Sequence, residues 1–277
     1  MNSTPTQRIA VVTGTTHGIG AALEHRLLDA GWQLITINRS AAPHRDGVQR
    51  ITADLADPAS TYEAVAGVRE TDRFIDLLIN NAGVLLPEHH YTATGFEHHY
   101  TVNTLAPYLL TTGLKDRLTA GSTVITVSSF ALFRAGPLDL DTLIRPTGSV
   151  RKLFGIYAHS KLATSMTTAA LAADYAAAGI TLRSIDPGPT RSNMTAGSGL
   201  PIYLRPWRPF FSSADKAAAS ILRAADDKPG DAGHTYLTSK LTPKALPDHA
   251  RDPHRQQLLL DRLEHDRRSL SQHPHRS

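Results

Sequence analysis

The stretch RIAVVTGTTHGIG, residues 8–20, decides the fold of this chain. It begins with a short β-branched apolar run, and residues 18–31 then repeat apolar side chains at helical spacing, so a strand, a glycine turn and a helix are predicted in that order. The backbone N–H groups of such a turn, together with the helix N-terminus, bind a pyrophosphate. Gly14, Gly18 and Gly20 are separated by three residues and then by one, which differs from the common GxGxxG spacing.

The rest of the chain alternates strand and helix patterns. Apolar runs predict further strands at 32–38, 48–55, 74–83, 122–129 and 180–188, and helices over 95–113 and up to Gly179. Strands that alternate with helices pair through right-handed crossovers, so we expect an α/β fold: a single doubly wound Rossmann-type domain whose parallel sheet carries helices on both faces. The core should span about 8–240, followed by a C-terminal helix at about 250–268 and a polar tail at 269–277.

Composition excludes several other classes of protein. The 277 residues are 41% hydrophobic, and the net charge of +4 is scattered rather than gathered in a basic stripe, so no nucleic-acid partner is expected. The absence of cysteine excludes disulfides and thiolate chemistry. The polar start MNSTPTQR and the lack of an apolar run of about 18 to 20 residues predict a cytoplasmic protein with no membrane partner.

The end of the second predicted strand indicates which nicotinamide cofactor is bound. A carboxylate there accepts hydrogen bonds from the adenosine ribose, whereas an arginine pairs with a 2′-phosphate. This chain has Asn38, Arg39 and Ser40, so NADP(H) is favoured over NAD(H). His17 adds a second possible cation in the glycine turn, with a surface-loop role as the alternative, and Asp54 with Leu55 should border the adenine.

Several motifs together resemble the short-chain dehydrogenase/reductase family, in its retinol-dehydrogenase-like branch. They occur in family order from residue 9 to about 195: TGTTHGIG, ADLAD, LLINNAGVL, GFEHHYTVNTLAPYLLT, VITVSSFA, YAHSKLA and DPGPTRSNM. Weaker similarity extends to the C-terminal helix, so the resemblance covers essentially the whole chain.

The resemblance implies four catalytic residues. Tyr157 would be the general acid/base, Lys161 its activator and a ribose ligand, Ser129 the hydroxyl that holds the substrate oxygen, and Asn103 the anchor of a proton-relay water. Ser128 competes with Ser129, but strand alternation points the two in opposite directions. The residues expected to contact NADP(H) are Gly14, Thr16, His17, Gly18, Ile19, Gly20, Asn38, Arg39, Ser40, Asp54, Leu55, Asn81, Ala82, Gly83, Tyr157, Lys161, Pro187, Gly188 and Thr190.

Spacing and chemistry agree with these roles. Tyr157 and Lys161 are neighbours at i, i+4 on a helix, and a nearby ammonium lowers the pKa of a phenol, which is about 10 in free tyrosine, toward working pH. The expected reaction is NADP(H)-dependent interconversion of a ketone or aldehyde and an alcohol. Two other functions stay open: a non-redox cyclase or isomerase on the same fold, and an NADP(H)-sensing binding protein.

Two long segments, 130–155 and 191–213, interrupt the alternation and are expected to form lids or walls of the substrate pocket, with ordinary surface loops as the alternative. The apolar residues in them suggest a moderately bulky, largely apolar small molecule: Leu132, Phe133, Ile202, Tyr203, Trp207, Phe210 and Phe211. The histidines at 89, 90, 98 and 99 form pairs that are adjacent in sequence and have no accompanying cluster of Asp and Glu, so no metal is expected. The helices that begin near 95 and 155 are apolar on more than one side, which predicts a homodimer or homotetramer.

Overall fold

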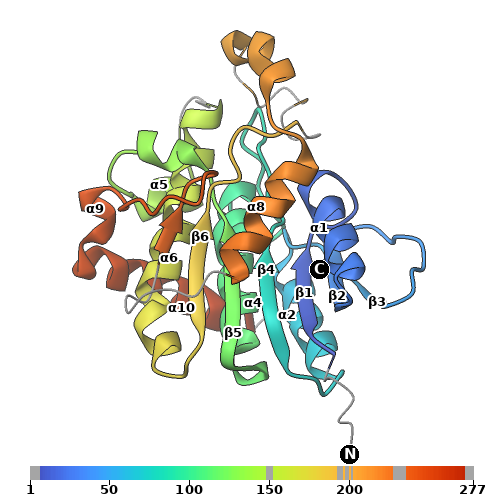
Figure 1. Ribbon diagram of the computed structural model, residues 1–277. Helices are drawn as coiled ribbons and strands as arrows, with labels where there is room; N and C mark the ends of the chain where they lie inside the picture. The colour runs from blue at the N-terminus through green and yellow to red at the C-terminus, as the bar shows by residue number, and fades with distance from the viewer. Residues whose placement is uncertain are drawn as a thin grey trace, which may run out of the picture.

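The computed structural model describes residues 7–147, 152–191, 196, 200, 202–226 and 235–271. Its centre is a seven-stranded, all-parallel sheet in the order β3-β2-β1-β4-β5-β6-β7 (Figure 1). The strands are β1 (Ile9–Thr13), β2 (Gln33–Asn38), β3 (Val48–Thr52), β4 (Ile75–Asn80), β5 (Leu118–Val127), β6 (Thr181–Ile185) and β7 (Thr235–Leu237). The predicted single α/β domain is confirmed, and β7 is the one strand of this sheet that the sequence did not predict.

Helices cover both faces because alternate residues of each strand point to opposite sides. On one face, α1 (Gly18–Asp29) and α8 (Ala214–Asp226) share an apolar cluster with Ala10 and Val12 of β1. On the other face, α2 (Pro58–Arg69), α4 (Ala106–Gly113) and α6 (Ile156–Ala176) share a cluster with Val11. The order of strands reverses at β1, which opens the crevice where doubly wound sheets bind ligands.

The helix predicted over 95–113 is interrupted. It consists of α3 (His98–Tyr100), a stretch of π-helix, η1 (Thr101–Leu105), and α4. The Ala106 N–H donates to the Thr101 carbonyl five residues earlier. Single π-turns inside helices are frequent at functional sites, and this one contains Asn103.

Shorter elements connect the rest. The segment after β5 folds into η3 (Phe130–Arg134), α5 (Leu140–Ile144) and η4 (Lys152–Phe154). The remaining helical elements are η2 (Lys115–Arg117), η5 (Ile202–Phe210), α9 (Asp248–Arg251) and α10 (Pro253–Ser271). Within the described ranges, no helix combines the length and apolarity needed to span a bilayer.

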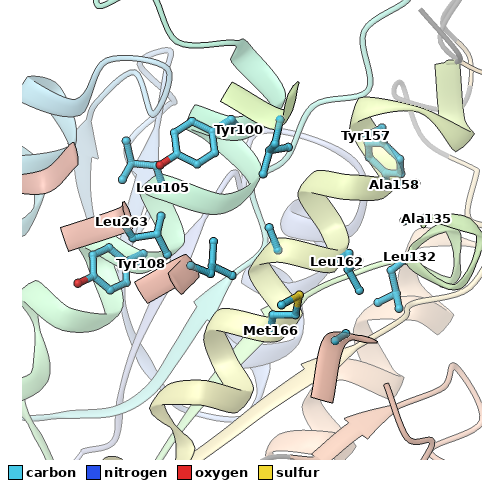
Figure 2. Packing of buried hydrophobic residues seen from close by; sticks show 14 of the residues in the cluster. Tyr100, Leu105, Tyr108, Leu132, Ala135, Tyr157, Ala158, Leu162, Met166 and Leu263 are labelled. Carbon is cyan, nitrogen blue, oxygen red and sulfur yellow. The ribbon is translucent and has the colours of Figure 1, made fainter. Parts of the chain in front are cut away.

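The C-terminal helix α10 packs against the outer side of α4 and α6. Leu259 and Leu263 are buried in one cluster with Tyr108 and Met166 (Figure 2). Two tyrosines hydrogen-bond its carboxylates: Tyr100 Oη donates to buried Asp266 at 2.6 Å, and Tyr108 Oη donates to Glu264 at 3.0 Å.

This docking accounts for the apolar helix faces that prompted the prediction of a dimer. The second apolar side of α4 and α6 packs on α10 of the same chain, so pairing of two chains through that side would require α10 to leave. The assembly itself stays a prediction, but these faces no longer argue for it.

We expect Tyr100→Phe to weaken the docking of α10. The change removes the donor to Asp266, whose remaining partner, Arg262, bonds it at 3.0 and 3.2 Å. Loss of one bond to a buried carboxylate costs roughly 1–3 kcal/mol of unfolding free energy, measurable by urea denaturation. Tyr91→Phe is the matched control, because Tyr91 also donates to an oxygen, of Pro146, but is 50% exposed. Equal losses in the two variants would contradict the assignment.

Candidate active site

Five loops meet where the parallel strands β1, β2, β4, β5 and β6 end. The carboxyl ends of parallel strands lie at one edge of the sheet, so the loops that follow them share a crevice. The residues predicted from the sequence to touch the cofactor lie in these loops, in the loop after β3, at the start of α1 or α6 or, for Asn38, at the last position of β2.

The glycine turn after β1 is shaped for a phosphate. Gly14 and Gly18 have φ angles of +71° and +59°, in the left-handed region that favours glycine. A Cβ on Gly20 would lie 1.8 Å from the Gly14 carbonyl oxygen, so no side chain fits there. The first turn of α1 contains no acidic residue, and no side chain caps its N-terminus. These free N–H groups suit the pyrophosphate of a dinucleotide.

Thr16, His17, Gly18 and Ile19 form the outer part of this turn. Thr16 and His17 are exposed, and their side chains hydrogen-bond each other at 2.8 Å. The imidazole is therefore held at the surface of the turn, beside the N-terminus of α1.

Two asparagines support the turn from below. Asn38 is buried and accepts from the Thr15 N–H at 2.6 Å, while its amide donates to the Thr15 hydroxyl at 3.1 Å. Asn81 donates to the carbonyls of Thr13 and Gly14 at 2.9 and 3.1 Å. The side chain of Asn38 thus supports the glycine turn from the end of β2. Its contact with a bound cofactor stays a prediction.

The residues after Asn38 face solvent. Arg39 and Ser40 are exposed, and Arg39 has no hydrogen bond or ion pair with the part of the chain that the structure describes. The nearby Arg50, by contrast, pairs with buried Glu24 at 3.0 and 3.1 Å. Arg39 is therefore a free cation at the end of β2.

The loop after β3 contributes differently from the loop after β2. The Asp54 carboxylate accepts from the Ala56 N–H at 2.9 Å and lies at the surface, whereas Leu55 is buried. The loop after β4 places Ala82 and Gly83 partly exposed next to the turn, and the Ala82 N–H donates to the Thr13 hydroxyl at 2.9 Å.

Tyr157 and Ser129 face each other across the crevice. The Ser129 hydroxyl is partly exposed and lies close enough to the Tyr157 phenol to lower its pKa, while Ser128 is buried and bonds Ser165 at 2.8 Å. Strand alternation therefore places Ser129, not Ser128, beside the tyrosine. Burial raises the pKa of Tyr157 to about 12, and Asp186 adds to the rise.

Lys161 lies one turn after Tyr157 on α6, but its ammonium is directed elsewhere. Its Nζ donates to the Val127 carbonyl at 2.8 Å, and burial lowers the pKa of Lys161 to about 8. The expected depression of the tyrosine pKa by this ammonium is not present in the described state. Burial determines the pKa shifts of both side chains, because both are almost wholly removed from water.

Asn103, in the π-turn, joins two parts of the site. Its Oδ1 accepts from the Val84 N–H at 2.8 Å, and its Nδ2 donates to the Val84 carbonyl and to Ser160 Oγ, each at 3.0 Å. Ser160 in turn donates to the Tyr157 carbonyl at 2.8 Å. The side chain of Asn103 thus holds the loop after β4 against the helix that carries Tyr157, and a relay water on this residue stays a prediction.

The chain is similar in sequence and fold to known proteins. Residues 8–138 match the family described as short chain dehydrogenase. The chain is 31% identical to human retinol dehydrogenase 12 over 235 residues, which cover 79% of this chain and 73% of the relative. The chain belongs to the short-chain dehydrogenase/reductase family. The predicted retinol-dehydrogenase-like branch is confirmed, and members of this family are oxidoreductases.

Two further similarities extend this result. Human polyprenol dehydrogenase is 29% identical over 263 residues, which cover 86% of this chain and 79% of the relative. An NADPH-bound carbonyl reductase from chicken fatty liver superposes with a TM-score of 0.64 at 23% identity, covering 86% of this chain and 99% of that one, which shows a shared fold.

One buried carboxylate of this short-chain dehydrogenase was missed from the sequence. Asp186, which begins the DPGPT segment after β6, accepts from the backbone N–H group of Gly188 at 2.9 Å. Burial raises its pKa, and the nearby Phe130 N–H opposes that rise. Asp186 thus holds the loop of Pro187, Gly188 and Thr190 beside the segment that follows Ser129. The motif was visible, but its aspartate gave no sign that it would point inward.

Of the residues predicted to wall the substrate pocket, some are packed in the protein and others face solvent. Leu132 is fully buried, and Phe133 packs edge-to-face on Tyr236 with ring centroids 5.4 Å apart. In η5, Tyr203, Trp207 and Phe210 are 61%, 62% and 81% exposed. These three side chains face solvent in this state, which corrects the expectation that they wall a pocket, because η5 projects from the body of the domain (Figure 1).

Two of the four histidines, His98 and His99, lie in α3, and the other two precede it in the chain. Among the described residues no three His, Asp or Glu side chains gather as a metal site. His90 and His98 pack edge-to-face at 6.1 Å, and His99 is held by other partners.

We expect Gly20→Ala to abolish tight dinucleotide binding. The new Cβ would meet the Gly14 oxygen at 1.8 Å and Asn81 Nδ2 at 2.8 Å, so the turn must open. The dissociation constants of NADPH and NADH, measured by titration calorimetry, should rise at least tenfold, which corresponds to about 1.4 kcal/mol. Gly136→Ala is the control, since nothing lies within 4 Å of its Cβ. Unchanged binding by Gly20→Ala would refute the assignment of the glycine turn as a cradle for the pyrophosphate.

Proposed function

We propose that this short-chain dehydrogenase is an NADP(H)-dependent oxidoreductase that interconverts a carbonyl and an alcohol on a moderately bulky, apolar small molecule. One observation carries the proposal: the hydroxyl of Ser129 lies close enough to the buried phenol of Tyr157 to lower the phenol's pKa, at the edge of the sheet that also presents the glycine cradle. A substrate oxygen between the two hydroxyls would receive a hydrogen bond from each.

The proposed roles follow from chemistry. Bound NADPH would supply the hydride to the carbonyl carbon. With a pKa of about 12, Tyr157 is protonated at neutral pH, and this is the form that donates a proton to the substrate oxygen. Ser129 would stabilise negative charge on that oxygen by a preorganised hydrogen bond. Lys161 would hold the ribose from the floor of the crevice and Asn103 the loop after β4.

The preference for NADP(H) rests on the end of β2. Exposed Arg39 has no protein partner within the described ranges, and the adjacent Asn38 brings no negative charge that would repel a 2′-phosphate. Arginine pairs with phosphate through charge-assisted hydrogen bonds. His17 would add a partial positive charge from the glycine turn.

The apolar substrate is supported by two kinds of observation. The relatives named retinol dehydrogenase and polyprenol dehydrogenase act, by their names, on apolar alcohols. Phe130, the residue after Ser129 in the chain, is 48% exposed and provides apolar surface on the segment that carries Ser129. We propose an apolar aldehyde or ketone, or the corresponding alcohol, as the substrate class.

The test is reduction of a panel of apolar aldehydes and ketones, followed as NADPH oxidation at ~340 nm. We expect turnover by the wild-type chain and at most a few per cent of it in Tyr157→Phe, because phenylalanine keeps the ring and removes the proton donor. NADPH affinity should stay within about threefold, since the change leaves the glycine cradle untouched.

Other outcomes point to the alternatives. Full activity in Tyr157→Phe would reject the tyrosine as acid. Product formed without net NADPH consumption would indicate a cyclase or isomerase, and NADPH binding with no turnover of the panel would favour a sensor.

We expect Arg39→Gln to lower the preference for NADPH over NADH. The KM for NADPH should rise roughly tenfold, because a charge-assisted bond contributes about 1.5–3 kcal/mol, while the KM for NADH stays within twofold. Arg73→Gln, an exposed arginine before β4, is the matched control. Equal effects on both cofactors would assign Arg39 a structural role and leave the basis of the preference elsewhere.

A further inference from the structure

His99 is a buried histidine that contacts the catalytic tyrosine but has no part in the reaction described above. It is 2% exposed, and its ring packs edge-to-face on the Tyr157 ring, with centroids 6.2 Å apart and an interplanar angle of 78°. Its two ring nitrogens are both occupied. Nε2 lies 3.0 Å from the Leu86 N–H, and Nδ1 lies 2.7 Å from Glu97 Oε1.

These partners determine where the proton lies. A backbone N–H can only donate, so Nε2 must accept from Leu86 and carry no proton. The neutral ring therefore carries its proton on Nδ1 and donates it to Glu97. The hydrogen bond made by one ring nitrogen selects the tautomer at the other.

Glu97 is itself held by hydrogen bonds of both its side chain and its backbone. It is fully buried, its Oε2 accepts from the N–H groups of His99 and Tyr100 at 2.6 and 3.3 Å, and its own N–H donates to the Ile144 carbonyl at 2.9 Å. Glu97 is also the N-cap of α3. One carboxylate therefore both caps the start of this helix and selects the tautomer of His99.

His99 and Asn103, one helical turn apart, both bind the backbone of the loop after β4. Asn103 holds both backbone polar groups of Val84, and His99 holds the N–H of Leu86, two residues further along the same loop. Toward α6, Asn103 meets Ser160 and His99 meets Tyr157. The loop after β4 is thus fixed at two points against the helix that carries the acid.

We propose that Glu97 and His99 are positioning residues for the reaction: Glu97 keeps His99 in the Nδ1-protonated form, and that form fixes both the Leu86 loop and the orientation of the Tyr157 ring. The inference rests on the proposed function for its kinetic consequence, but the placement of the proton stands on the hydrogen bonds alone. Neither residue is a catalytic group, because neither bonds the phenol oxygen or the Ser129 hydroxyl among the described contacts.

Glu97→Gln tests the tautomer directly. A glutamine has one oxygen, which the two backbone N–H groups at the start of α3 require, so its NH₂ would face Nδ1. His99 would then carry its proton on Nε2, opposite the Leu86 N–H, and that bond would be lost. We expect kcat for carbonyl reduction to fall roughly tenfold to a hundredfold. The dissociation constant of NADPH should stay within about twofold, and the Leu86 amide should exchange with deuterium at least tenfold faster.

His99→Gln, added to the Glu97→Gln variant, should restore an acceptor for the Leu86 N–H. The side-chain oxygen of glutamine reaches the position of Nε2 and accepts from Leu86 whatever residue 97 is. The double variant should therefore have the kcat and the Leu86 exchange rate of His99→Gln alone, so the two changes are not additive. Glu63→Gln, an exposed glutamate on α2, is the matched control and should behave as wild type.

Two results would overturn the proposal. Wild-type kcat and wild-type Leu86 exchange in Glu97→Gln would show that the tautomer does not matter. Additive losses in the double variant, in step with falling thermal stability, would assign the pair to packing alone. If the wild-type chain reduces none of the carbonyl panel, the proposed function fails, while amide exchange at Leu86 still decides where the proton of His99 lies.

Discussion

The contact between the first glycine turn and the start of α1 is the constraint on which the site depends. Gly20 approaches the Gly14 carbonyl so closely that only hydrogen fits between them, and Asn81 donates to that same carbonyl from the loop after β4. This contact brings the ends of β1 and β4 together at the point where the strand order reverses. The cradle for a pyrophosphate and the loop that leads to Asn103 are therefore one packed unit, and a change in either displaces the other.

Burial has opposite effects on the two titratable residues of the YAHSK segment. Removing charge from water is costly, so the same environment raises the pKa of the Tyr157 phenol to about 12 and lowers that of the Lys161 ammonium to about 8. Both shifts favour the neutral form. In this state Tyr157 is therefore protonated and can donate a proton. The Lys161 ammonium donates to the Val127 carbonyl, the acceptor within its reach at the end of β5.

The fold and most of the site were predictable because they depend on local patterns. Strand periodicity, the glycine spacing and the alternation of Ser128 and Ser129 are set by residues close in sequence. Contacts between distant parts of the chain could not be predicted in this way. Asn38 turns toward Thr15 because the glycine turn lies above it, and the apolar second side of α4 and α6 is covered by α10, from the C-terminal end of the chain. η5 carries aromatic side chains that suit a pocket by composition, yet Tyr203, Trp207 and Phe210 point outward, which composition cannot reveal.

The polar side chains of the site divide by chemistry into those that hold loops and those left for a ligand. The amides and carboxylates bond main-chain groups: Asn38 holds the glycine turn, Asn81 the first strand, Asn103 and Glu97 with His99 the loop after β4, and Asp186 the loop of Gly188. Groups with two lone pairs or a planar amide suit this task, because a backbone offers donors and acceptors in fixed pairs. A ligand would then meet backbone N–H groups, the hydroxyls of Ser129 and Tyr157, and the cations Lys161 and Arg39. A substitution among the loop-holding residues therefore acts on the reaction by moving these groups, without touching the ligand.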